Sequence, residues 1–353
     1  MNQSRSEYYG RNKRQRMATG TLKLDKWLSY DQTSLIPTHQ STLPHRADAD
    51  TSVQFGPWKL QVPIIAAPMP DVSNGQMAKR LFELGSLGWI HRFQSIKEAM
   101  SEWGSPTIST GIAFGLSEMY IPWVERFYYF GARVFLLDTA NGYSLGVQRT
   151  IERLKNNYPD IFIVAGNVGS SEAFRALEDW GADAIRVGIA GGSVCNTRTE
   201  TGVYSPMASV ILECAQRGHK KIYGPKEKEP NHALLIADGG IKSPSDLCKA
   251  LALGADLVMM GGAFAGTAES PGVVLKVDGK KYKVLRGAAS FSVQKENGND
   301  NIEYNEGAET LAPYVGSVEK VIQRYQAGLR SSMSYMDARN LAEYRKNVKV
   351  VEV

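Results

Sequence analysis

Cysteine is scarce in this 353-residue chain, and its scarcity excludes two kinds of structural site. The three cysteines, Cys195, Cys214 and Cys248, are too few for a disulfide framework and lack the close spacing of a zinc site. Such sparse use of cysteine is typical of a reducing compartment, so we expect a cytoplasmic protein.

Long apolar runs and a strong charge of one sign are also absent. The apolar stretches are short and interrupted by glycine or charged residues, which predicts neither a signal peptide nor a transmembrane helix. The net charge of +5 is mild, and part of it comes from Arg11, Lys13, Arg14 and Arg16. Residues 1–26 show no apolar period and are expected to form a mobile basic tail. We therefore expect neither a nucleic-acid partner nor a membrane partner.

The rest of the chain repeats short runs of β-branched and apolar residues. Because these runs do not alternate with polar residues, they indicate parallel strands covered on both faces. Helical patterns separate them, and two of these, Ser170–Trp180 and Ser243–Leu253, open at serine and stop before glycine. Eight such units in series predict an α/β fold, a single (β/α)8 TIM barrel over residues 27–353. The eight runs are Val62–Ala67, Leu87–His91, Thr107–Ala113, Arg133–Asp138, Phe162–Ala165, Ala184–Val187, Leu234–Ala237 and Leu257–Met260.

A doubly wound Rossmann-type sheet is the alternative fold. It would have fewer strands and a glycine-rich loop after the first one, but here the first run leads into Ala67-Pro68-Met69-Pro70. A hairpin and a polar flap are expected on the C-terminal face of the barrel after the eighth strand, followed by an amphipathic helix. These segments are Val273–Val277, Asp278-Gly279 and Lys281–Leu285 for the hairpin, Ser292–Glu309 for the flap, and Ser317–Leu329 for the helix.

Glycines follow the seventh and eighth strands, where TIM barrels often bind a phosphate group. Gly239 and Gly240 follow one strand, and Gly261 and Gly262 follow the other. Because glycine lets backbone amides approach an anion closely, these pairs predict a phosphate site, with simple tight turns as the alternative. Asp238, just before the first pair, is a candidate acceptor for ribose hydroxyls.

Cys195 is the candidate nucleophile because it lies in a glycine-rich loop rather than in an apolar period. Arg186 and Arg198 are near it in the sequence, and nearby cations favour the reactive thiolate. The alternative is an inert core cysteine, which is our interpretation of Cys214 and Cys248 because both fall in helical patterns.

Two other strand ends carry polar residues. Asp138 ends the fourth strand and is a candidate for binding a ribose or a nicotinamide, with a structural role in the barrel rim as the alternative. His91 ends the second strand, and we interpret this lone histidine as a packing residue rather than a base.

The segment Arg186–Arg198, followed by Thr201–Val203, resembles the catalytic loop of the IMP dehydrogenase and GMP reductase family. The resemblance covers nearly the whole chain, from about residue 28 to residue 345, with several motifs in the same order. The other matching segments are Tyr30-Asp31, Leu35–Pro37, Pro63–Met69, His91–Phe93, Ala165–Val168, Ile236–Gly240, Ala265-Gly266, Glu269-Ser270 and Leu329–Ser331.

Within this family the chain is more similar to the GMP reductase branch. Three segments carry this similarity: Asp138–Tyr143, Ser193–Val203 and Asp278–Lys283. No insertion follows the second strand, where most IMP dehydrogenases carry a pair of nucleotide-sensing CBS-type repeats. The Arg-Tyr pair with which IMP dehydrogenases activate water is also lacking, and the nearest stretch is Asn301-Ile302-Glu303-Tyr304.

The resemblance implies NADPH-dependent reductive deamination of GMP to IMP through a covalent thioimidate on Cys195. Thr197 would help to protonate the departing amine. The implied purine nucleotide site consists of Met69, Ser193, Asp238, Gly239, Gly240, Gly261, Gly262, Arg286 and Gly287. The implied cofactor site, for NADPH or alternatively NADH, consists of Arg92, Asp138, Thr139, Ala140 and Asn167, with Arg92 toward the extra phosphate of the cofactor. The resemblance also implies a homotetramer and a potassium ion bound by backbone carbonyls of Ala190, Gly192 and Cys195.

Four positions depart from the family pattern, and they cluster near the purine ring. They are Phe291 in place of the glutamate that partners the threonine, Pro70 with Asp71 shifted by one, Ala190 in place of glycine, and Ala288 in place of methionine. Glu303, Glu306 and Glu309 are the candidates to supply a carboxylate instead. The departures keep three alternatives open: an enzyme for a modified or deoxy purine nucleotide, an IMP dehydrogenase, and a catalytically silent nucleotide-binding homologue.

Overall fold

The computed structural model describes residues 27–104, 110–218, 232–296, 298, 302 and 305–353. The predicted basic tail, residues 1–26, lies outside these residues, as do Glu303 and Tyr304.

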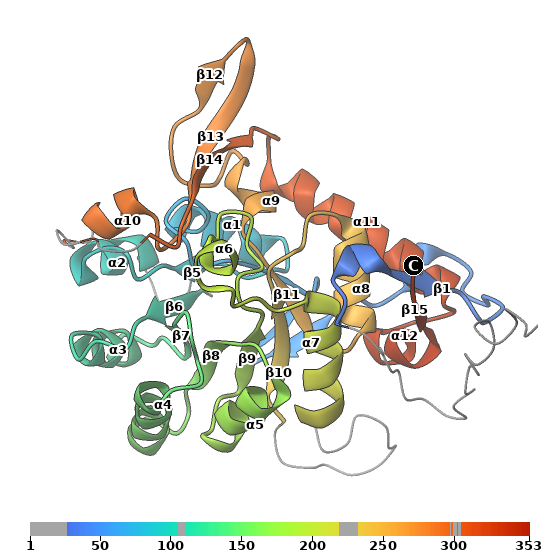
Figure 1. The fold of residues 1–353 in the computed structure, drawn as a ribbon, viewed down its shortest axis with the longest axis horizontal. Coiled ribbons are helices and arrows are strands. Elements are labelled where there is room, and N and C mark those ends of the chain that lie inside the picture. Colours follow the sequence, from blue (N-terminus) through green and yellow to red (C-terminus); the bar gives the residue numbers. More distant parts are fainter. Residues whose placement is uncertain (1–26, 105–109, 219–231, 297, 299–301, 303–304) are drawn as a thin grey trace, which may run out of the picture.

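A closed barrel of eight parallel strands forms the centre of the molecule (Figure 1). The strands are hydrogen-bonded in the order β4-β11-β10-β9-β8-β7-β6-β5, and a parallel bridge between Ile65 and Leu87 joins the first to the last. They are β4 (Ile64–Ala66), β5 (Trp89–Ile90), β6 (Gly111–Phe114), β7 (Val134–Asp138), β8 (Phe162–Val168), β9 (Ala184–Val187), β10 (Leu234–Asp238) and β11 (Leu257–Met260). Each overlaps one of the eight predicted runs, so the TIM barrel is confirmed.

Helices surround the barrel, and alternate strand residues pack against them or into the barrel interior. Trp89, Leu136, Val164 and Ile236 fill the interior, while their sequence neighbours pack outward. This double burial is why the strands read as continuous apolar runs. The main helices are α1 (Gly75–Glu83), α2 (Ile96–Trp103), α3 (Tyr120–Tyr129), α4 (Leu145–Asn157), α5 (Ser171–Asp179), α7 (Met207–Glu213), α8 (Pro244–Ala252) and α11 (Val318–Tyr335).

The helix boundaries follow from capping residues. Ser170 caps α5 by accepting a hydrogen bond from Ala173 N, and Ser243 caps α8 by accepting one from Asp246 N, which confirms both predicted starts. The last long helix, α11, continues beyond its predicted end at Leu329 because its buried stripe continues to Met333.

A three-stranded antiparallel sheet stands away from the barrel rim (Figure 1). It consists of β12 (Leu275–Val277), β13 (Lys280–Arg286) and β14 (Glu309–Pro313), and α10 (Phe291–Glu296) lies between the last two in the chain. The predicted hairpin is confirmed, whereas the predicted flap is partly regular: it begins within α10 and ends in a third strand.

Two small antiparallel sheets and several short helices complete the described part of the chain. β1 (Thr33–Ile36) pairs with β15 (Lys349–Glu352), while β2 (Val53–Phe55) and β3 (Trp58–Leu60) form a hairpin that packs on the interior cluster. The short helices are η1 (Tyr30–Gln32), η2 (Arg46–Asp48), α6 (Thr197–Thr201), η3 (Cys214–Gly218), α9 (Gly262–Ala265) and α12 (Leu341–Asn347). Among the helices of the described part, none has the length and apolar character needed to cross a membrane.

Candidate active site

The predicted nucleophile loop is held by the segment that precedes β14. Cys195 lies between β9 and α6, and it faces Gly307 in an antiparallel bridge. Asn196 N donates to the carbonyl of Glu306 at 2.7 Å, and Ala308 N donates to the carbonyl of Val194 at 2.9 Å. The flap and the cysteine loop therefore form a short two-stranded ladder at the barrel mouth.

This ladder completes a hydrogen-bonded chain from the thiol to a carboxylate. The Cys195 thiol donates to Thr197 Oγ1 at 3.2 Å, and Thr197 Oγ1 donates to Glu306 Oε2 at 2.5 Å. Thr197 thus has the carboxylate partner that the sequence comparison failed to place. Phe291 does not occupy this position, since it begins α10 with 54% of its surface exposed. Glu309 instead accepts a hydrogen bond from Ser292 N at 3.3 Å.

Glycine-rich loops meet beside the cysteine loop. A Cβ placed on Gly262 would lie 3.3 Å from Ser193 Oγ, and one on Gly261 would lie 3.4 Å from Met69 Sδ. Gly239, at a φ of +109°, approaches Gly191 so closely that a Cβ would lie 2.8 Å from its Cα. The structure therefore brings Met69, Ser193, Gly239, Gly261 and Gly262 to one part of the rim, and binding of a phosphate group there stays a prediction.

Two glycines of the predicted nucleotide site donate their backbone amides within the protein. Gly240 N donates to the carbonyl of Gly191 at 2.8 Å. Gly287 N donates to the carbonyl of Ala308 at 2.9 Å, and a Cβ on Gly287 would lie 2.5 Å from the carbonyl oxygen of Val194. Gly287 is thus required for close packing of the hairpin base against the cysteine loop.

An ion-pair network links the ends of strands β7 to β10 across the mouth of the barrel. Arg186 donates through Nη1 to Asp138 Oδ1 at 2.5 Å and through Nη2 and Nε to Asp238 Oδ2 at 2.7 and 3.1 Å. Arg92 Nε donates to Asp138 Oδ2 at 3.0 Å, and Asn167 Nδ2 donates to Asp238 Oδ2 at 2.8 Å. Four residues predicted for nucleotide or cofactor binding are therefore connected through Arg186, whose link to them the sequence did not reveal.

The charges in this network stabilise one another. Burial raises the pKa of Asp138, but the cations of Arg186 and Arg92 outweigh burial and hold that pKa below its usual value. Burial lowers the pKa of Arg186, but the carboxylates of Asp238 and Asp138 outweigh burial and raise that pKa above its usual value. Two cations and two anions thus balance in a largely desolvated site.

The cations expected beside the thiol have other partners. Arg186 points into the barrel mouth and pairs with the two carboxylates, because strand alternation places it on the interior side with Ala184. Arg198 stacks on Tyr204, with its Cζ 4.2 Å from the ring centroid. Both guanidinium groups are therefore engaged elsewhere, and their influence on the Cys195 thiol stays a prediction.

The loops after β7 and β8 are locked together on the cofactor side. Thr139 donates to the carbonyl of Gly166 through both N and Oγ1, at 3.1 and 2.7 Å, and Asn167 N donates to the carbonyl of Thr139 at 2.9 Å. Ala140 follows as an exposed residue. Thr139 and Asn167, both predicted cofactor residues, are thus joined by hydrogen bonds between the two loops.

Arg286, predicted to bind the nucleotide, anchors the hairpin base. Asp71 Oδ2 accepts hydrogen bonds from Arg286 N at 2.8 Å and Nε at 2.9 Å, while its Oδ1 accepts one from Nη2 at 2.8 Å. Glu296 accepts a further bond from Nη1 at 2.7 Å. The shifted Asp71 thus has a structural partner, and contact of Arg286 with a nucleotide stays a prediction.

Ala190 stands in the cysteine loop at the position where the family pattern has glycine. Its φ is +57°, in the left-handed region that favours glycine. Two residues on, the carbonyl of Gly192 accepts a hydrogen bond from Cys195 N at 3.2 Å. Ala190 thus adopts a conformation that suits glycine, and the potassium site stays a prediction.

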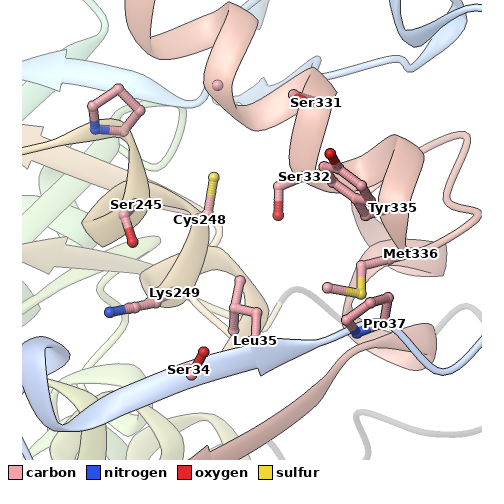
Figure 2. A pocket seen from close by; sticks show the side chains of 12 residues that line it. Ser34, Leu35, Pro37, Ser245, Cys248, Lys249, Ser331, Ser332, Tyr335 and Met336 are labelled. Carbon is pink, nitrogen blue, oxygen red and sulfur yellow. The ribbon is translucent and has the colours of Figure 1, made fainter.

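A hollow of about 580 Å³ lies elsewhere, between β1, α8 and α11 (Figure 2). Cys248, Lys249 and Tyr335 are among its lining residues, and it contains none of the predicted nucleotide or cofactor residues. Burial raises the pKa of the Cys248 thiol to about 11, and burial also raises the pKa of Cys214. Both thiols are therefore protonated near neutral pH, in agreement with their interpretation as core residues.

Comparison with known proteins finds relatives in the IMP dehydrogenase and GMP reductase family. The family model described as the IMP dehydrogenase / GMP reductase domain matches residues 27–353. The chain is 33% identical to the GMP reductase of Chromobacterium violaceum over 343 residues, covering 92% of this chain and 98% of that protein. It is 33% identical to the GMP reductase of Levilactobacillus brevis, covering 90% and 92%. It is 37% identical to the inosine-5'-monophosphate dehydrogenase of Chlorobaculum parvum, covering 70% of this chain but 50% of that protein.

Proposed function

The chain belongs to the IMP dehydrogenase / GMP reductase family, and from this premise we propose that it is an NADPH-dependent GMP reductase, which converts GMP to IMP and ammonia. The observation that carries the proposal is the chain from Cys195 through Thr197 to Glu306. It joins a nucleophile to a proton carrier, as deamination requires. The near full-length match to proteins named GMP reductase supports the same conclusion.

The proposed reaction begins when the thiolate of Cys195, whose proton has passed to water, bonds through Sγ to C2 of the guanine ring. The bond between C2 and the exocyclic nitrogen then breaks, and one proton from the Glu306 carboxyl, passed through Thr197, allows ammonia to leave. A thioimidate between Cys195 and C2 remains. NADPH, when bound on the side of Asp138, would supply the hydride that C2 accepts. The C2–S bond then breaks, its electron pair returns to Cys195 Sγ, and IMP departs.

The other residues position the two ligands. The loops containing Ser193, Gly239 and Gly262 bind the 5'-phosphate, and Asp238 accepts hydrogen bonds from the nucleotide ribose. Asp138 lies on the cofactor side of the mouth and accepts hydrogen bonds from the cofactor. A potassium ion bound by carbonyls of the cysteine loop would support the turn at Ala190, and the subunits would assemble as a homotetramer.

The test is a turnover assay with purified protein, GMP and NADPH, which follows loss of the reduced cofactor together with IMP and ammonia. We expect GMP-dependent oxidation that disappears in Cys195→Ala. Parallel reactions use NADH, a panel of other purine nucleotides, and IMP with NAD⁺. Activity with IMP and NAD⁺ alone would identify a dehydrogenase instead, and turnover of another nucleotide alone would indicate that Ala288 has changed base recognition. Nucleotide binding without any turnover would contradict an enzymatic role.

A further inference from the structure

One guanidinium group stands between the two ligand sites. Asp138 on β7, Gly166 on β8 and Arg186 on β9 are register partners across three adjacent strands. A Cβ on Gly166 would lie 2.6 Å from Cβ of Arg186, so the absence of a side chain on β8 lets Arg186 cross it to Asp138. On its other side Arg186 pairs with Asp238, at the end of β10.

We propose that Arg186 couples the two sites, so that binding of the nucleotide at Asp238 strengthens binding of the cofactor at Asp138, and the reverse. The identity of the two ligands rests on the proposed function. Arg186 is a positioning residue in this proposal, because it acts through the two carboxylates.

The geometry of the carboxylates supports the coupling. Arg186 and Asn167 donate to Oδ2 of Asp238, which leaves Oδ1 to accept from a ribose hydroxyl. Asp138 accepts from Arg186 at Oδ1 and from Arg92 at Oδ2. When a ribose hydroxyl donates a hydrogen bond to one carboxylate, that carboxylate attracts the shared Arg186 guanidinium less strongly. The guanidinium then shifts toward the other carboxylate and changes the orientation of that carboxylate.

Burial and the shape of the Arg186 guanidinium determine how strongly its shift changes ligand binding. The Arg186 side chain is 8% exposed, so solvent does not screen its contacts. An arginine fork donates in several fixed directions at once, whereas a lysine ammonium is a point charge that cannot bridge two carboxylates in the same geometry. Arg186→Lys therefore keeps the charge but breaks the bridge.

Arg92 provides a matched control. It pairs with Asp138 alone among the carboxylates that the structure describes, and its guanidinium also stacks on Phe93 at 4.2 Å. Arg92→Lys should weaken cofactor binding by the same factor whether or not the nucleotide is present.

The experiment measures binding by calorimetry with GMP and NADP⁺, a pair that cannot complete the proposed reaction because NADP⁺ has no hydride to donate. The coupling factor is the ratio of the NADP⁺ dissociation constants without and with GMP. We expect about 5- to 150-fold for the wild-type protein, the usual range for linked sites, a fall to below about 2-fold in Arg186→Lys, and the wild-type factor in Arg92→Lys.

Several outcomes decide the proposal. It is overturned by a wild-type factor of unity, or by coupling that survives in Arg186→Lys. If Arg186→Lys does not fold, Asp138→Asn removes the same ion pair from the cofactor side. Loss of the effect of NADP⁺ on the affinity for GMP in that variant supports the proposal, and persistence of the effect refutes it. Failure of the wild-type protein to bind GMP would instead overturn the proposed function, so the two failures are distinguishable.

Discussion

Glu306→Gln separates proton transfer from the rest of the proposed reaction. Glutamine is almost the same size, and its amide oxygen can still accept the 2.5 Å hydrogen bond from Thr197 Oγ1. It cannot store or return a proton. The variant therefore leaves the cysteine loop in place, including the backbone bond from Asn196 N to the carbonyl of residue 306.

The expected loss falls on ammonia release. General acid–base help by a positioned side chain is worth about 100- to 10,000-fold, or roughly 3 to 5 kcal/mol of activation free energy. Transfer of a hydride between IMP and NADP⁺ needs no departing amine, so this partial reaction should stay within about 2-fold of wild type by the same argument.

Rapid-quench measurement of ammonia release, alongside NADPH formation from IMP and NADP⁺ without ammonia, resolves the two steps. Glu309→Gln is the control, since Glu309 lies in the same part of the chain but contacts Ser292 rather than Thr197. Ammonia release at the wild-type rate in Glu306→Gln would refute our assignment, and so would an equal loss in both steps.

Two further predictions concern stability. Burial lowers the pKa of His91 to about 4, below its value in the unfolded chain. The contribution of neutral His91 to the free energy of unfolding is therefore complete above pH 6.5 and is lost as the pH falls toward 4. Chemical denaturation from pH 7 to 4 should show wild type losing about 3 kcal/mol relative to His91→Asn, and parallel curves would contradict this origin. Asp71→Asn leaves the Arg286 cation without its buried partner and should lower the free energy of unfolding by about 3 kcal/mol. Glu296→Gln, at an exposed partner of the same arginine, should cost under about 1 kcal/mol, and equal losses in urea denaturation would argue against an anchoring role for Asp71.

The sequence predicted the barrel because its information is local. The strands are buried on both faces and six of the eight main helices have a capping side chain, so short windows contain the signal. The glycine loops and Cys195 were found in the same way, from residue types at strand ends.

The missing parts of the site depend on contacts between distant segments. Thr197 and Glu306 are 109 positions apart, and the polar flap has no period that would predict the ladder beside Cys195. Asp71 and Arg286 are 215 positions apart. Arg186 is different, since strand alternation from Ala184 predicts an inward side chain; nearness in the sequence was the wrong guide to its partners.

The ladder between the cysteine loop and the flap sets a limit on how this chain can vary in length. Side chains along a strand alternate between its two sides, so a shift of one residue would turn Glu306 away from Thr197. Inserting or deleting a single residue between Glu306 and β14 would therefore misplace the carboxylate even with every amino acid of the site retained. Length changes elsewhere in the flap leave that alternation intact, and evolution can extend or shorten it there without losing the acid.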